Sequence, residues 1–277
     1  TDAPRLEDSS DDQVTLIRHL RGRGYDAELL AHLPGRYRID YRHSNQPLVS
    51  IIIPTRDQLP MVQRCVESLL ELTRYQNFEI LIVDNDSQTP EAREWLQAIS
   101  ELDEQKLRVL RYPHPFNYAA INNMAVRESR GEYLVLLNND TAIVQEQWLE
   151  EMLNQAQRPE VGIVGAKLLY PDGRIQHAGV ILGLRGPADH PFIGEVSDAS
   201  GYMQRLQLDQ NYAALSKECL LLRRELFLQA GGFDEEPLLA RWIDIDLCLK
   251  LQQAGLLNVW TPRATLLMDV LPTTTPR

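Results

Sequence analysis

Short apolar segments alternate with amphipathic ones from Val49 to about residue 157, and this alternation constrains the fold more than any other feature. Val49 to Ile53 is a continuous apolar run closed by Pro54, which is typical of a strand buried on both faces. In residues 60–74 the apolar side chains instead recur at helical spacing, and Phe78 to Val83 is again an apolar run. The pattern predicts an α/β fold with a mostly parallel sheet and helices on both faces.

The alternation continues through the middle of the chain. It predicts helices and strands in turn at 90–99, 107–111, 117–129, 132–137 and 145–157. Beyond about residue 165 the pattern is less regular, and Gly and Pro are scattered over 171–201. We expect a mixed extension with longer loops in that region.

The first 47 residues have a different character. Residues 1 to about 12 are acidic and Ser-rich, which predicts disorder. Apolar residues at helical spacing from Gln13 to Leu33 predict a short helical preamble, followed by a polar linker that ends at Pro47. We therefore divide the chain into residues 1–47, a main domain at 48–262 and a C-terminal tail at 263–277.

Composition restricts the partners. The chain has 28 Lys and Arg against 39 Asp and Glu, a formal net charge of −11. Nucleic acid is not an expected partner, because binding a phosphate backbone requires clustered basic residues. No apolar run is long enough to cross a bilayer, and we expect neither a signal peptide nor an anchor. The three cysteines are distant from one another, which favours reduced thiols in a cytosolic protein.

Polar side chains follow three of the predicted strands directly. The segments are Pro54-Thr55-Arg56-Asp57, Asp84-Asn85-Asp86-Ser87 and Asn138-Asn139-Asp140. Because ligands of open α/β sheets bind beyond the carboxyl ends of the strands, we expect these segments to meet in one site. Each segment taken alone is equally compatible with a turn, since Asp, Asn and Ser are all turn formers.

The third segment is a variant of an Asp-x-Asp pair. Side-chain oxygens two residues apart at a strand end can hold Mg²⁺ or Mn²⁺ while diphosphate oxygens take other positions around the cation. Asn138 replaces the first Asp and removes one formal charge. The alternative is that Asp140 or Thr141 caps the next helix.

A further carboxylate stands near the C-terminal end of the main domain. Asp244 lies between Ile243 and Ile245 at the start of a helical pattern. Apolar neighbours tend to raise the pKa of a carboxyl group, which suits a general base. Asp246 is more simply explained as an acidic residue in the first helical turn.

With these residues in view, the chain resembles the inverting glycosyltransferases of family 2, which have the GT-A fold. The resemblance runs from about Leu48 to Pro262 and is closest to the bacterial rhamnosyltransferase-like branch that builds O-antigens and exopolysaccharides. The segments that carry it are Val49 to Thr55, Ile80 to Ser87, Phe116 to Asn122, Leu137 to Thr141, Gln176-His177-Ala178-Gly179, Gly231 to Glu235 and Asp244 to Leu249.

The resemblance implies a Rossmann-like nucleotide-binding half at 48–141 and an acceptor half at 142–262. It implies a UDP-, dTDP- or GDP-sugar donor and a Mg²⁺ or Mn²⁺ ion held by Asp140. The residues that it assigns to the nucleotide sugar are Pro54, Thr55, Asp57, Asp84, Asn85, Asn122 and Asn138.

In the acceptor half, the resemblance makes Asp244 the base that deprotonates the acceptor hydroxyl. His177, Trp242 and the 231–235 turn would lie on the acceptor side. The implied acceptor is a saccharide or lipid-linked saccharide of a growing polysaccharide. The expected location is the cytoplasm, and peripheral association with the inner membrane or with a biosynthetic complex is left open.

Two other functions remain open from the sequence. The chain has Leu266 to Asp269 where relatives commonly have a His that reaches the metal, and Lys217-Glu218 where small residues are usual. These departures favour, as the alternative, a non-catalytic glycosyltransferase-like binding module in a polysaccharide assembly complex. A nucleotidyltransferase is less well supported, because no Gly-rich loop with a following basic residue comes after the first strand.

Overall fold

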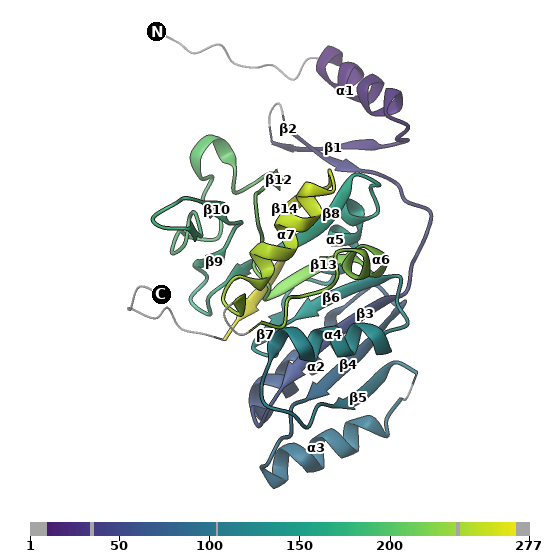
Figure 1. Cartoon of the computed structure of the whole chain (residues 1–277). Coiled ribbons are helices and arrows are strands. Elements are labelled where there is room, and N and C mark those ends of the chain that lie inside the picture. The colour runs from purple at the N-terminus through teal and green to yellow at the C-terminus, as the bar shows by residue number, and fades with distance from the viewer. Residues whose placement is uncertain (1–9, 34–35, 104, 237–238, 270–277) are drawn as a thin grey trace. The chain divides into compact units, whose positions relative to one another are not determined.

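The computed structural model describes the chain except residues 1–9, 34–35, 104, 237–238 and 270–277. It divides into two compact units, residues 1–46 and residues 47–277 (Figure 1). The acidic start, which we expect to be disordered, lies almost entirely outside the described residues.

The first unit contains a helix and a two-stranded antiparallel sheet. Helix α1 (Ser10–Gly22) is followed by β1 (Glu28–Leu33) and β2 (Arg36–Asp40), which pair with Glu28 opposite Asp40. The prediction of a helical preamble up to Leu33 and a polar linker beyond it is therefore wrong after Gly22. Gly24 has a φ of 87°, which an L-residue rarely adopts and which ends the helix. The segments that follow form hydrogen bonds with each other across a hairpin.

The second unit is built on a mixed sheet. Four parallel strands form one side of it, in the order β6 (Tyr133–Leu137), β3 (Val49–Thr55), β4 (Phe78–Asp84) and β5 (Leu107–Arg111). The sheet continues beyond β6 through β13 (Cys219–Arg223), β8 (Val161–Leu169), β14 (Leu257–Met268) and β12 (Gln210–Asn211). Strand β13 is antiparallel to both β6 and β8, whereas β14 is parallel to β8.

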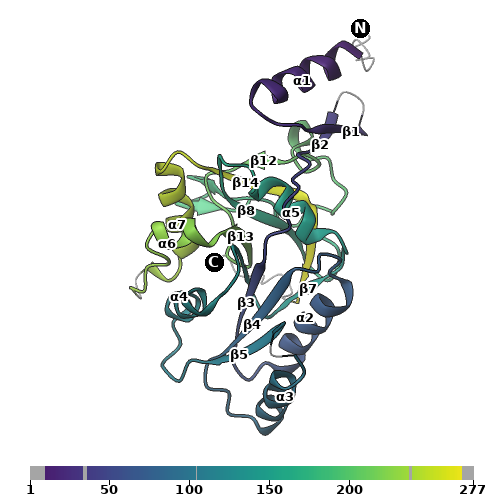
Figure 2. The same cartoon turned by 90° about the vertical axis from the view of Figure 1, so that its right-hand side faces the viewer.

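Helices cover both faces of this sheet. One face packs against α2 (Leu59–Leu72), α3 (Pro90–Ser100) and α5 (Trp148–Ala156), and the other against α4 (Tyr118–Glu128), α6 (Arg224–Gln229) and α7 (Ile243–Gln253). Figure 2 shows α2 and α3 on the opposite side of the strands from α4. Successive residues of β3 point to opposite faces of the sheet. Ile51 and Ile53 pack in the core on the α2 side, and Ile52 packs in the core on the α4 side. The predicted α/β fold with its mostly parallel sheet is confirmed.

The last strand corrects the predicted C-terminal tail. Strand β14 extends past Pro262 to Met268, and its last residues pair with β7 (Thr141–Ile143). The register of β14 against β8 shifts between Thr261 and Thr265, so that Pro262 lies in an irregularity and does not end the strand. Residues 263–268 therefore belong to the sheet, and residues 270–277 lie outside the described residues.

Between β8 and β13 the chain forms the expected irregular extension. It contains β9 (Ile175–His177), the small hairpin of β10 (Ile181–Leu182) and β11 (Ala188–Asp189), and the short helix η1 (Tyr202–Gln204). Strand β9 pairs with the end of β8, which attaches the extension to the main sheet. No helix in the described part of the chain is long and apolar enough to span a membrane.

Candidate functional site

The three predicted strand-end segments meet at one edge of the sheet. Thr55 and Asp84 are paired partners at the ends of β3 and β4, and the Asn85 N–H donates to the Thr55 carbonyl at 2.9 Å. Asn139, just past β6, donates from Nδ2 to the Thr55 hydroxyl at 3.1 Å. Parallel strands place these segments together because all of their carboxyl ends point the same way.

Asp57 connects two of the loops at this edge. Its Oδ1 accepts backbone N–H groups of Gln88 at 2.6 Å and Thr89 at 2.8 Å, directly before α3. Its own N–H donates to the Ser87 hydroxyl. These backbone hydrogen bonds lower the pKa of the Asp57 carboxyl, because they favour its charged form. One oxygen of Asp57 is thus engaged in holding the loop after β3 to the start of α3.

Asp84 and Asn85 shape the loop after β4. Asp84 is buried, and its Oδ1 accepts the Ser87 N–H at 3.0 Å, as the turn interpretation requires. Asn85 donates from Nδ2 to the carbonyls of Tyr112 and His114 and so fixes the loop after β5. Asp84 also lines a cavity of about 210 Å³ under α3, together with Arg93, Arg111 and four other residues.

The start of α4 brings an aromatic hydroxyl to the same edge. Asn117 caps the helix by accepting the Ala120 N–H at 3.1 Å. The next residue is Tyr118, the first of the helix, and its hydroxyl lies 3.3 Å from Asn138 Oδ1 and 3.4 Å from the Lys217 carbonyl oxygen. Asn122 is fully buried, and its Nδ2 donates to the Tyr118 carbonyl at 2.7 Å. The sequence motif predicted Asn122 as a site residue but did not single out Tyr118.

Asp140 stands where the first half of the domain meets the last strand. Its backbone carbonyl accepts the Asp269 N–H at 2.8 Å. Burial raises the pKa of the Asp140 carboxyl, and the negative charge of Glu218 raises it further. Asp140 Oδ1 is buried and has no hydrogen-bond partner among the described residues.

Glu218 precedes β13 and lies opposite Asn138, whose N–H donates to the Glu218 carbonyl at 3.0 Å. Its side chain is almost buried, and Oε1 lies 3.6 Å from Lys217 Nζ. Its negative charge also raises the pKa of Asp244, after the larger effect of burial. Sequence reasoning noted Glu218 only as a departure from the family, because its neighbours across the sheet are about 80 residues earlier in the chain.

Asp244 lies in the first turn of α7, and its carboxylate approaches Lys217. It is 9% exposed, and burial raises the pKa of its carboxyl. Oδ2 accepts the Lys217 N–H at 3.1 Å, and Oδ1 accepts the Ile245 N–H at 2.9 Å. Asp246 instead forms an ion pair with Lys250 along the helix at 2.7 Å. The two carboxylates are therefore in different environments.

His177 is enclosed rather than open. It is 1% exposed, and its Nε2 accepts the N–H groups of Gly179 at 3.3 Å and Ser216 at 3.4 Å. Nδ1 must then carry the proton and donate to Nδ1 of His190, 2.9 Å away. Burial lowers the pKa of His177 well below its usual value. Sequence reasoning missed His190, since nothing in the irregular extension links it to His177.

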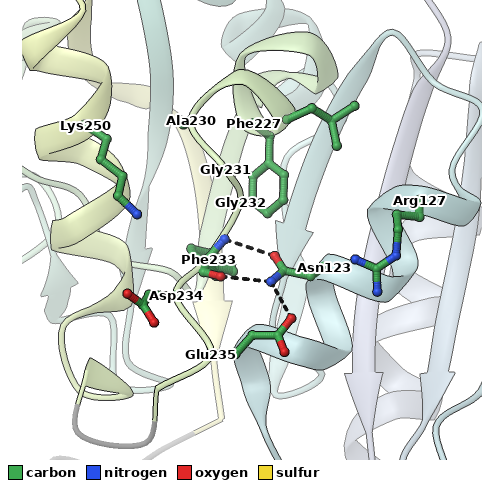
Figure 3. Close-up of a pocket in the computed structure, with 11 residues that line it drawn as sticks. Asn123, Arg127, Phe227, Ala230, Gly231, Gly232, Phe233, Asp234, Glu235 and Lys250 are labelled. Carbon is green, nitrogen blue, oxygen red and sulfur yellow. Dashed lines mark hydrogen bonds between the residues drawn. The ribbon is translucent and has the colours of Figure 1, made fainter.

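Two features that the resemblance assigns to the acceptor side remain, Trp242 and the 231–235 turn. Trp242 precedes the helix, and the Arg241 guanidinium lies 4.9 Å from its ring centroid. The Gly231–Glu235 turn is held by Asn123 of α4, which the sequence did not single out. Asn123 Nδ2 donates to the Phe233 carbonyl and to Glu235 Oε1, and its Oδ1 accepts the Phe233 N–H (Figure 3). Gly231 and Phe233 line a cavity of about 510 Å³ whose wall includes Arg127 and Lys250.

Comparison with known proteins identifies the family. A family model described as glycosyl transferase family 2 matches residues 50–229, more than half of the chain. The chain belongs to glycosyl transferase family 2. The O-antigen biosynthesis protein RfbC of Myxococcus xanthus is 41% identical over 91% of this chain and 20% of its own length. Protein y4gI of Sinorhizobium fredii is 50% identical over 86% of this chain and 26% of its own length.

This family 2 chain thus spans only a fifth to about a quarter of the length of these two relatives. Among solved structures, the mannosyltransferase PcManGT from Pyrobaculum calidifontis, in complex with GDP-Man and Mn²⁺, matches with a TM-score of 0.61. That match has 14% sequence identity and covers 95% of this chain and 66% of the other. The GT-A fold predicted from the sequence is confirmed.

Proposed function

We propose that the chain is the catalytic domain of an inverting, metal-dependent glycosyltransferase acting in polysaccharide biosynthesis. The observation that carries this proposal is that a half-buried Asp140 and a buried Asp244, which come from different parts of the domain, lie near the same Glu218. The pKa of each carboxyl is raised, as is typical of carboxylates that bind a cation or accept a proton in a functional site. The name of the relative RfbC supports the biosynthetic role.

The donor in this proposal is a UDP-, dTDP- or GDP-sugar bound at the carboxyl edge of the parallel strands. Thr55, Asp84 and Asn122 would face the nucleoside, and Asn85 and Asp57 would hold the loops around it. The fold neighbour solved with GDP-Man and Mn²⁺ supports a nucleotide-sugar donor. Asn138 would face the diphosphate, since its Oδ1 lies at the end of β6 beside the Tyr118 hydroxyl.

Asp140 fits a divalent cation, because its buried Oδ1 has no hydrogen-bond partner in the described part of the chain. Among the described residues no group of three or more His, Cys, Asp and Glu side chains could hold a metal. The protein would therefore supply few ligands and the diphosphate the others, as is common for Mg²⁺. A bound Mg²⁺ or Mn²⁺ would neutralise charge on the leaving diphosphate.

Asp244 would act as the general base. It would take the proton of the acceptor hydroxyl while that oxygen forms a bond to C1 of the donor sugar, on the face opposite the leaving group. The bond from C1 to the diphosphate oxygen breaks, and the nucleotide diphosphate leaves as an anion. The anomeric centre is thereby inverted. The second carboxylic acid that a glycosidase uses to protonate its leaving group is not required here.

The acceptor would be a hydroxyl of a saccharide or lipid-linked saccharide, bound near Trp242. Both ring nitrogens of His177 already form hydrogen bonds within the protein. His177 would therefore support the acceptor side of the site without binding the acceptor itself. We propose a cytoplasmic location for the reaction, as the sequence predicts. Within this proposal, residues 48–141 form the donor half of the domain and the following residues its acceptor half.

The variant Asp244→Asn tests the base. Removing the carboxylate should lower turnover by roughly 10²- to 10⁴-fold while nucleotide affinity stays near that of the wild type. Release of UDP, dTDP or GDP from a panel of nucleotide sugars with Mn²⁺ gives the rate, and calorimetry with the same nucleotides gives the affinity. Asp246→Asn, two residues away and paired with Lys250, is the matched control and should keep its activity.

Wild-type activity in Asp244→Asn would overturn the assignment of the base. A wild-type chain that binds a nucleotide but releases none from any donor would instead favour the non-catalytic binding module. The observation that favours this second function is the Lys217-Glu218 pair, which lies beside Asp244.

A further inference from the structure

The end of β6 and the start of β13 bring two side chains together that are far apart in the sequence. Cys219 pairs with Leu137, and one step further the Asn138 N–H donates to the Glu218 carbonyl at 3.0 Å. Directly opposed residues of antiparallel strands project their side chains from the same face of the sheet, about 5 Å apart at Cβ. Glu218 therefore stands beside Asn138, the position at which the Asp-x-Asp pair has lost its first carboxylate.

Three side chains around this point have oxygens that lack a hydrogen-bond partner among the described residues. They are Oε2 of Glu218, Oδ1 of Asp140 and Oδ1 of Asn122, and all three atoms are buried. Glu218 is 9% exposed and Asn122 is fully buried. Buried acceptors are nearly always satisfied in folded proteins, so unsatisfied ones indicate a missing donor, water or ion.

The charges around these oxygens favour a cation over a hydrogen-bond donor. Glu218 lies opposite Asn138, two residues before Asp140, so the turn after β6 brings a second carboxylate close to that of Glu218. Lys217 Nζ lies 3.6 Å from Oε1 of Glu218 and its side chain is partly exposed, so this ion pair offsets little of the Glu218 charge. Hard divalent cations prefer carboxylate oxygens, and their affinity rises with the number of charged ligands.

We propose that Glu218 supplies the second carboxylate ligand of the divalent-cation site, in partnership with Asp140. The charge that is absent at Asn138 is thereby provided by the neighbouring strand. This inference rests on the proposed metal dependence. With this role, Glu218 would contribute to activity, although the Lys217-Glu218 departure from the family by itself favours a non-catalytic module.

Binding of Mn²⁺ tests this assignment without any turnover. Free Mn²⁺ is measured by electron paramagnetic resonance during titration of the whole chain, with Mn²⁺ alone and with added UDP or GDP. Glu218→Gln keeps the shape of the side chain and removes its charge, and should weaken Mn²⁺ binding by about 10- to 100-fold. Glu71→Gln, at an exposed position on α2, removes the same charge elsewhere and should leave binding unchanged.

A charge relocation makes the test sharper. In the double variant Asn138→Asp with Glu218→Gln, the carboxylate moves across the strand pair to the facing position. Its Mn²⁺ affinity should recover to within a few-fold of the wild type, which simple damage to the fold would not allow. Circular dichroism and thermal melting of each variant show that the fold is intact.

The outcomes separate this inference from the proposed function. Loss of Mn²⁺ binding in Asp140→Asn but not in Glu218→Gln would overturn the role of Glu218 and leave the metal site standing. Failure of the double variant to recover affinity over Glu218→Gln would also count against it. A wild-type chain that binds no Mn²⁺, alone or with either nucleotide, would overturn the metal dependence and this inference together.

Discussion

Individual aspartates at the carboxyl edge of the sheet differ mainly in what surrounds them. Asp57 accepts two backbone N–H groups, and the pKa of its carboxyl is lowered. Asp244 also accepts two backbone N–H groups, but burial has the larger effect and the pKa of its carboxyl is raised. The same residue type thus serves as a loop connector in one place and as a candidate base in another.

The buried imidazole of His177 predicts a dependence of stability on pH. Its pKa is lowered in the folded chain, first by burial and then by His190. Below about pH 6.5 an unfolded chain takes up a proton on this side chain and the folded chain does not. The free energy of unfolding should therefore fall with decreasing pH in that range, by at most about 1.4 kcal/mol per pH unit for one proton.

Urea unfolding at a series of pH values measures this slope. The variant His177→Asn should show a smaller slope than the wild type below about pH 6.5, whatever its absolute stability. His19→Gln, which changes an exposed histidine of α1, serves as the control and should keep the wild-type slope. Equal slopes in all three proteins would contradict the buried neutral state of His177.

At the scale of elements, α4 connects segments of the second unit that are far apart in the sequence. Its first turn carries Tyr118, which contacts the ends of β6 and β13, and its next turn carries Asn123, which holds the 231–235 turn. Gly232 can lie against this helix because it has no Cβ; a Cβ there would lie 2.7 Å from Asn123 Oδ1. Its φ of 72° also favours glycine. One helix therefore positions residues of both the proposed donor side and the proposed acceptor side.

Removing the Asn123 side chain should loosen this link. Asn123→Ala leaves the buried N–H and carbonyl of Phe233 without their side-chain partner, which should lower the free energy of unfolding by about 1–3 kcal/mol. Chemical denaturation measures the change. Arg127→Ala, on the same helix but exposed, should stay within about 0.5 kcal/mol of the wild type. An unaffected Asn123→Ala would show that the turn is held by other contacts.

At the scale of the molecule, residues 47–277 contain the complete described cores of the sheet. Both hydrophobic clusters are made of residues between Val49 and Met268, and neither includes a described residue of the first unit. The catalytic proposal likewise involves residues of the second unit alone. The first unit has its own small contacts, such as the edge-to-face pair of Tyr25 and Tyr41 at 5.0 Å.

A chain that begins at Pro47 should therefore fold on its own. We expect one cooperative thermal transition and a Mn²⁺ affinity within a few-fold of the full chain, because both hydrophobic clusters of the sheet are kept. Calorimetry and the Mn²⁺ titration check these two expectations. A shortened chain that melts without cooperativity would contradict the division of the structure at residue 46.

The sequence by itself determined the succession of strands and helices, because apolar periodicity follows directly from which faces are buried. It also brought Thr55, Asp84 and Asp140 to one edge, since parallel strands end on the same side. It missed the hairpin after Gly22, where β1 pairs with the strand that follows it, and it missed the strand beyond Pro262, where pairing of β14 with the distant β8 and β7 overrides the local signal.

Only the tertiary structure decided the neighbours of each charged group. Glu218 is about 80 residues from Asn138, and His190 follows His177 through an irregular loop, so no local pattern joins either pair. Burial and charge at one point depend on every segment that reaches it, and those segments meet only when the sheet and its helices are assembled. Candidate residues such as Asp140 and Asp244 were therefore readable from the chain, whereas Glu218 and the surroundings of each carboxylate were not.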